Sequence, residues 1–364
     1  MTAAGVADIT DLPRKVGQSG DRLLDVQGLT TSFHTRDGIV RAVSGIDFHV
    51  DRGEILGLVG ESGCGKSVTA LSILGLVAAP GRVEAGQILF DNQDLLTIGA
   101  KGLRALRGER ISMIFQQPQS SLNPVYDVGR QIGEVLEIHK GMKTKTARSR
   151  AAELLRMVGI PDPERRLEAY PHALSGGMAQ RVMIAMALAC EPELLIADEP
   201  TTALDVTIQA QILDLMRALQ ADTGTAIILI THDLGVVAEM CDRVAVMYAG
   251  EIVEHADTAT LFADPKHPYT RGLIGSVPTL GQVQSELTTI PGSVPNLIDL
   301  PAGCRFAPRC LPRVAQQVAH CELEHPELLP SGGSTSPGLG VGHDVRCWIY
   351  HRTDGSPIEG ARVQ

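Results

Sequence analysis

The segment GESGCGKS, residues 60–67, places glycines before a lysine and a serine in the spacing G-x-x-x-x-G-K-[ST]. Glycines let the backbone wrap closely around a phosphate chain and point its N–H groups at the anionic oxygens. Lys66 can reach the outer phosphates, and the hydroxyl of Ser67 suits Mg²⁺. The segment therefore predicts a nucleoside-triphosphate site made of Gly60, Ser62, Gly63, Cys64, Gly65, Lys66, Ser67 and Val68.

An acidic element and a histidine complete this chemistry. The apolar run LLIAD ends at Asp198 and is followed by Glu199, and the run AIILI is followed two residues later by His232. A buried strand would bring Asp198 to the Mg²⁺, while Glu199 would polarise the attacking water. Two carboxylates after one strand are a weak signal alone. Together with the phosphate loop they predict hydrolysis of the nucleotide.

The motif LSGGMAQ, residues 174–180, provides a second anion-binding element. Ser175, Gly176 and Gly177 precede the helical stretch MAQRVMIAMALA, so their backbone N–H groups would form a helix N-terminus. One nucleotide does not need two such cradles from one chain. The motif therefore predicts two chains placed head to tail, each giving Ser175 to the γ-phosphate on the other. The methionines of this helix are expected to pack in the core.

These residues need a scaffold in which strands and helices alternate. β-like runs occupy residues 23–26, 39–50 and 54–60, and an apolar spacing typical of a helix begins after Ser67. LLIAD and AIILITHD are apolar without alternation, as in parallel strands that are buried on both faces. Residues 143–160 have helical spacing. The pattern predicts an α/β fold with at least three inner strands.

Taken in order, these motifs resemble the nucleotide-binding subunit of an ABC transporter, from Leu23 to Phe262. The resemblance implies a P-loop NTPase of the ABC type over residues 21–262. Such a protein has a RecA-like core with an antiparallel β subdomain and an α-helical subdomain, here about residues 118–180. It also implies ATP and Mg²⁺ as cofactors, and ATP hydrolysis catalysed by Lys66, Glu199 and His232.

The same resemblance assigns further residues of the nucleotide site. Gln116 in MIFQQP would sense Mg²⁺ and contact a permease, with the neighbouring Gln117 as the alternative. Mg²⁺ would thus be held by Ser67, Gln116 and Asp198. Ala203, Leu204 and Asp205 would form a loop across the dimer, and Phe33 would stack on adenine.

Composition bounds the partners and the location of the chain. The 364 residues carry a formal net charge of −10, which disfavours nucleic acid as a partner. No apolar run approaches the ~18 residues that cross a bilayer. Residues 1–20 lack the apolar middle of a signal peptide, so they predict a disordered tail on a protein that stays in the cytosol.

Composition changes near Phe262, where proline and glycine become frequent. We expect a small loop-rich C-terminal domain over residues 263–352 and a tail over 353–364. HPYTRGLIGSVP and TTIPGSVPNLIDLPAGCRFAPRC resemble the C-terminal extension of ATP-binding subunits of bacterial oligopeptide and dipeptide importers, a group that includes nickel importers. SSLNPV, residues 120–125, resembles the same group.

That resemblance implies an ATPase that powers peptide import from the cytoplasmic face of the inner membrane. Its partners would be a second ATPase subunit (a copy or a paralogue), two permease subunits and, indirectly, an extracytoplasmic binding protein. Import of nickel or another small solute is an alternative. A soluble ABC ATPase acting on the ribosome or DNA is another, but it would usually show two cores in one chain or a basic arm, and neither is visible.

Four of the seven cysteines lie near the C-terminus, separated by five, ten and twenty-five residues: Cys304, Cys310, Cys321 and Cys347. A cytosolic location disfavours disulfides. Structural zinc sites usually have closer ligand pairs, whereas an iron–sulfur cluster tolerates irregular spacing. The resemblance implies a [4Fe–4S] cluster on these four residues, although the ten-residue interval is longer than usual. Such a cluster would hold together a region with little apolar surface. Cys190 and Cys241 are expected to be buried and inert.

Overall fold

The structure is a computed structural model that describes residues 21–202, 204–276, 290–331, 342–358 and 361. The expected N-terminal tail and Ala203 lie outside these residues. So do residues 332–341 and parts of the expected C-terminal tail.

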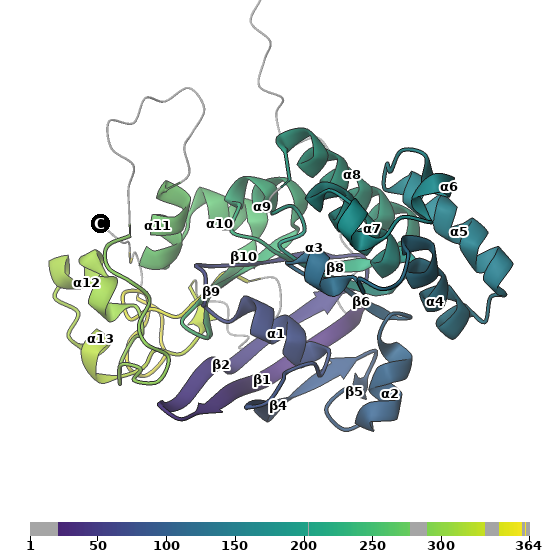
Figure 1. Ribbon diagram of the computed structural model, residues 1–364. Helices are drawn as coiled ribbons and strands as arrows, with labels where there is room; N and C mark the ends of the chain where they lie inside the picture. The colour runs from purple at the N-terminus through teal and green to yellow at the C-terminus, as the bar shows by residue number, and fades with distance from the viewer. Residues whose placement is uncertain (1–20, 203, 277–289, 332–341, 359–360, 362–364) are drawn as a thin grey trace, which may run out of the picture.

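The described strands form two sheets (Figure 1). The smaller sheet is antiparallel and has the order β2-β1-β4-β5, with β1 Arg22–Thr35, β2 Gly38–Asp51, β4 Gly81–Phe90 and β5 Gln93–Asp94. The larger has the order β11-β12-β10-β9-β3-β8-β7-β6. Its strands are β3 Ile55–Val59, β6 Ile111–Ile114, β7 Leu194–Asp198, β8 Ala226–Ile230, β9 Arg243–Tyr248, β10 Glu251–Asp257, β11 Leu329–Pro330 and β12 Asp344–Val345.

The inner strands of the larger sheet end next to the residues that the sequence predicts to be catalytic. β9, β3, β8, β7 and β6 pair in parallel, and β3, β7 and β8 are buried at every position. This confirms the prediction of an α/β fold with buried parallel strands. Because parallel strands end at one edge, the residues after β3, β7 and β8 meet there.

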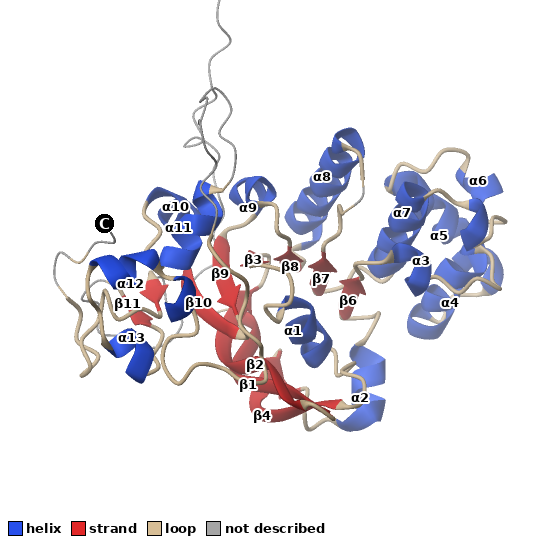
Figure 2. Ribbon diagram, turned by 60° about the vertical axis from the view of Figure 1, so that its left-hand side comes forward, coloured by secondary structure: helices blue, strands red, loops and turns tan. Residues whose placement is uncertain are grey.

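One group of helices stands apart from the rest beyond β6, at the right of Figure 2. Several short or medium helices gather beyond β6: α3 Pro118–Ser121, α4 Val128–Lys140, α5 Thr144–Met157, α6 Pro163–Arg166 and α7 Gly176–Leu188, with the 3₁₀ helix η1 Pro171–Ala173. The others are α1 Lys66–Ile73, α2 Gly99–Leu106, α8 Val206–Thr223, α9 Leu234–Met240, α10 Thr258–Ala263, α11 Pro268–Gly275, the 3₁₀ helix η2 Ala307–Arg309, α12 Leu311–Ala315 and α13 His320–Leu323. In the described part of the chain, no helix is long and apolar enough to span a membrane.

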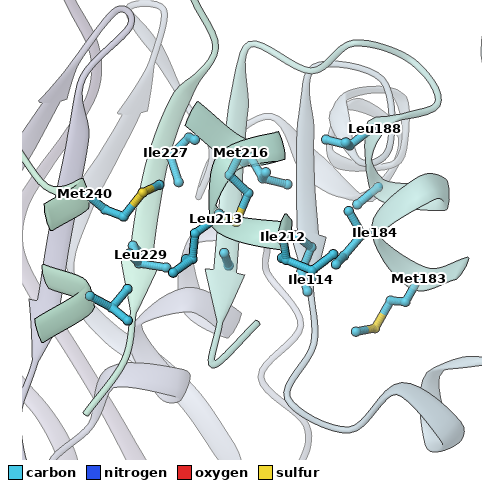
Figure 3. Close-up of a cluster of buried hydrophobic side chains, with 14 of the residues drawn as sticks. Ile114, Met183, Ile184, Leu188, Ile212, Leu213, Met216, Ile227, Leu229 and Met240 are labelled. Carbon is cyan, nitrogen blue, oxygen red and sulfur yellow. The ribbon is translucent and has the colours of Figure 1, made fainter. Parts of the chain in front are cut away.

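The hydrophobic core connects the larger sheet to the helices beyond β6. Figure 3 shows Ile212, Leu213 and Met216 of α8 between Ile227 of β8 and Ile184 of α7. These side chains belong to one buried cluster that also contains Met183. Met178 and Met186 pack against it partly buried, so the methionines of α7 do serve the core.

The C-terminal region contributes β11 and β12 to the larger sheet. β12 pairs antiparallel with β10, and the backbone N–H of Arg346 donates to the carbonyl of Val253 at 2.8 Å. Tyr269 and Phe306 belong to the buried cluster that contains the core helices. Residues before and after position 263 therefore share one buried cluster. A domain boundary at residue 263 stays a prediction.

Candidate active site

The phosphate loop lies between β3 and α1, where the sequence predicted it. Gly60 and Gly65 have φ of 152° and 113°, and a Cβ on either would come within 2.2 or 2.4 Å of the carbonyl oxygen of Met247 or Ala42. Only glycine fits such close backbone approach. Lys66 is buried, and its Nζ donates to the carbonyls of Gly60 at 2.7 Å and Glu61 at 3.0 Å. The loop thus holds the lysine inside the cradle that its own backbone forms.

The end of β7 supplies a carboxylate suited to Mg²⁺. Asp198 is 4% exposed, and among the described residues its Oδ1 has no hydrogen-bond partner. Burial raises the pKa of Asp198, while the hydroxyl of Ser67 and the ammonium of Lys66 oppose the rise. A buried carboxylate oxygen left without a partner costs free energy unless a cation or water satisfies it. Asp198 and Ser67 therefore fit a magnesium ion.

Glu199 follows Asp198 and lies at the centre of a polar group. The amide Nε2 of Gln116 donates to Glu199 Oε2 at 3.1 Å, and the hydroxyl of Thr202 donates to the same oxygen at 2.8 Å. Nδ1 of His232 lies 3.4 Å from Oε1. Burial alone would raise the pKa of Glu199, but these three contacts together lower it. A carboxylate that stays ionised can accept a proton from water, as a general base must.

The positions of Gln116 and Gln117 differ. Gln116 reaches Glu199 directly, which leaves its amide oxygen as the group that could bind Mg²⁺. Gln117 precedes α3, and its carbonyl accepts hydrogen bonds from Ser120 and Ser121. The geometry therefore favours Gln116 as the residue of this pair at the site.

The serine-glycine motif lies apart from the phosphate loop. Ser175 caps α7 by accepting from the N–H of Met178 at 3.3 Å, and Asp205 caps α8 by accepting from Ile208 at 3.0 Å. Both line a hollow of about 400 Å³ whose lining residues are Gly159, Ile160, Pro161, Ser175, Gly177, Met178, Arg181, Leu204, Asp205 and Ile208. No phosphate-loop residue lines this hollow, and the action of Ser175 on a nucleotide held by another chain stays a prediction.

Phe33 lies on β1, and a Cβ on Gly81 would come within 2.5 Å of its ring. The glycine leaves room for the aromatic side chain, which is half-buried. Its stacking on adenine stays a prediction.

The four C-terminal cysteines lie near one another. The backbone N–H of Cys304 donates to the carbonyl of Cys321 at 2.9 Å. A Cβ on Gly303 would come within 2.4 Å of that carbonyl oxygen, so this crossing needs glycine. Burial, then the charges of the other three thiols, raises the pKa of Cys347 well above its usual value. Burial likewise raises the pKa of Cys304 to about 11 and that of Cys321 to about 12.

All four thiols are free. Over the described ranges, however, no three His, Cys, Asp or Glu side chains stand close enough together to bind a single metal ion. Cys190 and Cys241 are buried at 3% and 1% exposure, as the sequence predicted.

Sequence reasoning missed several residues at the site. Thr202 follows Glu199 in the segment DEPTT, and its hydroxyl could have been noticed from that proximity. Glu61 is a variable position of the phosphate loop. Its partners Tyr269 and Arg309 lie more than 200 residues away in sequence, where no local pattern connects them.

Comparison with known proteins agrees with this geometry. The ABC transporter family profile matches residues 43–202, and the profile of the oligopeptide/dipeptide transporter C-terminal region matches residues 253–316. A dimeric ATP-binding cassette solved in a post-hydrolysis state with ADP and Pi superposes with a TM-score of 0.60 at 27% identity, covering 65% of this chain and 98% of that one. A subunit of an ABC transporter complex from Clostridium perfringens gives 0.55 at 31% identity, covering 67% and 91%.

Curated relatives are closer in sequence. The chain is 53% identical over 330 residues to a probable peptide ABC transporter ATP-binding protein of Sinorhizobium fredii, covering 90% of this chain and 95% of the relative. It is 51% identical to the dipeptide transport ATP-binding protein DppD of Bacillus subtilis, with the same coverage.

The fold and the site thus define an ATP-binding cassette, an ATPase that uses ATP and Mg²⁺. Within that class, the chain belongs to the family of ABC transporter ATP-binding subunits that carry the oligopeptide/dipeptide C-terminal region.

Proposed function

We propose that the chain hydrolyses ATP to power import of dipeptides or oligopeptides through a membrane ABC transporter. The observation that carries this proposal is the match of residues 253–316 to the oligopeptide/dipeptide C-terminal region. Relatives that share about half of their residues with the chain over nine tenths of its length are described as peptide or dipeptide transport proteins. An ABC core alone would leave the transported solute open.

The chain's own residues suggest how hydrolysis proceeds. The N–H groups of the phosphate loop and the Nζ of Lys66 would bind the β- and γ-phosphates. Mg²⁺ held by Asp198 and Ser67, with Gln116 nearby, would neutralise charge on the phosphates. Glu199 would take a proton from the attacking water. His232 would contact the γ-phosphate. Ser175 of a second chain would close over the nucleotide, as in a head-to-tail dimer.

A permease would dock beside the segment that follows Gln116. Phe115, Ser121 and Leu122 line a cavity of about 220 Å³ together with residues of α4 and α7. Nearby, Val125 and Tyr126 are 69% and 47% exposed. An apolar opening next to a residue that contacts Glu199 would let a membrane partner sense the nucleotide state. This cavity is an argument for a membrane partner at this face. We further propose, from the resemblance to peptide importers, that the chain works with two permease subunits on the cytoplasmic face of the membrane and indirectly with an extracytoplasmic binding protein.

For the four cysteines we propose a [4Fe–4S] cluster rather than a zinc ion. Cluster ligands bind separate irons and so stand farther apart than ligands that share one zinc. Cys310, Cys321 and Cys347 are buried and Cys304 is partly buried, and all four thiols are free and would repel one another when ionised. Their raised pKa values mean that a positive centre must replace the protons before the thiolates become stable. We assign Cys304, Cys310, Cys321 and Cys347 as the ligands and propose that the cluster holds residues 263–352 together.

Transport is tested by reconstitution. The complete transporter, with its permeases, paired ATPase subunit and binding protein, is placed in liposomes and supplied with ATP and a labelled dipeptide, a labelled pentapeptide or nickel. We expect peptide uptake that requires ATP and disappears in Glu199→Gln, while the complex still assembles. Uptake of nickel without uptake of either peptide would overturn the assignment of the solute.

The cysteine site is tested separately. The protein is purified without oxygen and assayed for iron, acid-labile sulfide and zinc. We expect about four irons and four sulfides per chain, as the formula of the cluster requires. A colourless protein with zinc or with no metal would contradict the cluster proposal and would leave the ATPase proposal standing.

A further inference from the structure

An arginine of the cysteine-bearing region binds the phosphate loop. Nη1 of Arg309 donates to Glu61 Oε2 at 2.6 Å, and Nη2 donates to Glu61 Oε1 at 3.0 Å. Two parallel hydrogen bonds between a guanidinium and a carboxylate fix the orientation of both groups. Arg309 directly precedes Cys310, and Glu61 directly follows the first glycine of the loop.

The surroundings of Arg309 hold its side chain in one place. Its side chain is only 6% exposed, and its Nε donates to the carbonyl of Pro291 at 2.8 Å. The guanidinium carbon lies 5.7 Å from the centre of the Tyr248 ring and 5.9 Å from that of Phe306. A buried guanidinium that is fixed by packing loses little freedom when it binds its carboxylate. The pair is therefore preorganised from the C-terminal side.

Glu61 is also held through its backbone. Its N–H donates to the hydroxyl of Tyr269 at 2.7 Å, and Tyr269 is fully buried on α11. Its carbonyl accepts from Nζ of Lys66 at 3.0 Å. Arg309 thus fixes the carboxylate of Glu61 and Tyr269 fixes its amide, while the carbonyl of Glu61 positions the catalytic lysine. Any displacement of Glu61 would move an acceptor of Lys66.

We propose that Arg309 is a positioning residue for ATP hydrolysis: by clamping Glu61, it holds the phosphate loop and Lys66 in the conformation that binds ATP. The C-terminal region then contributes to nucleotide affinity without touching the nucleotide. This inference rests on the ATPase function of the core.

A purely structural role would have different consequences. If Arg309 only joined two parts of the protein, its loss would lower the stability and the fraction of active protein. The KM for ATP of the folded fraction would not change. If Arg309 positions the loop, its loss raises KM and the Kd of Mg–AMPPNP, while kcat changes less.

The test uses the full-length chain and four variants. Arg309→Ala removes the clamp, Arg309→Lys keeps the charge without the two-pronged geometry, and Glu61→Gln removes the partner's charge. The double variant Glu61→Gln/Arg309→Ala tests whether the two act as one unit. Arg217→Ala is the control, because the ion pairs of Arg217 are with Asp214 and Glu239, which are not residues of the phosphate loop. Circular dichroism confirms folding, and titration with Mg–AMPPNP gives the Kd.

We expect Arg309→Ala to weaken binding on the order of tenfold, the scale of a charged hydrogen-bonded pair. Arg309→Lys should recover part of the loss, the double variant should be no worse than Arg309→Ala, and Arg217→Ala should match the wild type. If Arg309→Ala does not fold, Glu61→Gln decides by the same titration. Unchanged Kd in the folded variants overturns the inference. A wild type that fails to bind Mg–AMPPNP would instead contradict the ATPase function itself.

Discussion

The ATPase core and the C-terminal region, meaning the described residues of 263–352, bury different kinds of side chains. The core buries whole strands of aliphatic residues, and β3, β7 and β8 are closed to solvent along their full length. In the C-terminal region, β11 and β12 have two residues each and α12 and α13 have five and four. Its buried positions include the ionic Arg309 and the thiols of Cys310, Cys321 and Cys347.

This difference separates two jobs. Hydrophobic burial is non-directional and makes a stable platform, on which strand ends can present Asp198 and Glu199. Buried ion pairs are directional, and removing one partner leaves the other charge buried without compensation. The core thus supplies chemistry on a robust base, and the C-terminal region supplies contacts that depend on specific partners.

The largest expected effect separates chemistry from stability in the core. Glu199→Gln should lower kcat by about 10² to 10⁴, the usual contribution of a general base, while Mg–ATP binding persists. The free energy of unfolding should change little, because Glu199 lies outside the apolar strands. Steady-state ATPase assays with equilibrium binding measure both. Turnover near the wild-type rate would mean that another group activates the water.

Removing a buried charge of the C-terminal region should lower the free energy of unfolding more than removing an exposed charge on α5. Arg305 binds Glu251 at 2.9 Å, and their side chains are 10% and 7% exposed. Arg305→Met leaves Glu251 with less compensation and should cost about 3–5 kcal/mol of unfolding free energy. Arg150→Met, in an exposed pair with Glu153, should cost less than about 1 kcal/mol. Equal losses in urea denaturation would refute the distinction.

The thiols can be compared across the two regions. Cys347→Ser and Cys190→Ser each place a hydroxyl at a buried position, which costs about 1–3 kcal/mol when the hydroxyl lacks a partner. Only Cys347→Ser should also lose iron and lower the thermal midpoint further. Iron content and thermal unfolding of anaerobically purified proteins test this. Equal iron in both variants would exclude Cys347 as a ligand.

The last expected effect concerns pH. Burial lowers the pKa of His267 from 6.5 to about 4, and its Nδ1 accepts the N–H of Tyr269 at 3.1 Å. Between pH 6.5 and 4 the unfolded chain binds a proton that the folded chain does not. Folding stability therefore falls as pH falls through this window, by up to about 1.4 kcal/mol per pH unit.

His267→Asn keeps an acceptor for the cap of α11 but cannot titrate. Its stability should therefore depend less steeply on pH than that of the wild type between pH 6.5 and 4. His49 of the core also has a pKa of about 4 and stays in both proteins, so it cancels from the difference. Chemical denaturation at several pH values measures the slopes, and identical slopes would contradict the assignment.

Sequence alone predicted the parts of the site that depend on local patterns. The phosphate loop follows from its glycine spacing, and Asp198, Glu199 and His232 converge because parallel strands end at one edge. The crossing of Cys304 and Cys321 depends on how the loops of the C-terminal region pack. The clamp between Arg309 and Glu61 joins residues 248 positions apart, and no periodicity connects them. Such contacts become visible only once the chain is folded.

Hydrogen exchange at Glu61 tests whether the C-terminal region holds the phosphate loop. The Glu61 amide donates to Tyr269, so exchange of residues 60–67 reports whether the loop stays in place. In Arg309→Ala this segment should exchange faster than in the wild type, and in Arg217→Ala it should not. Equal exchange in the wild type and a folded Arg309→Ala would show that the core holds its phosphate loop without the C-terminal region.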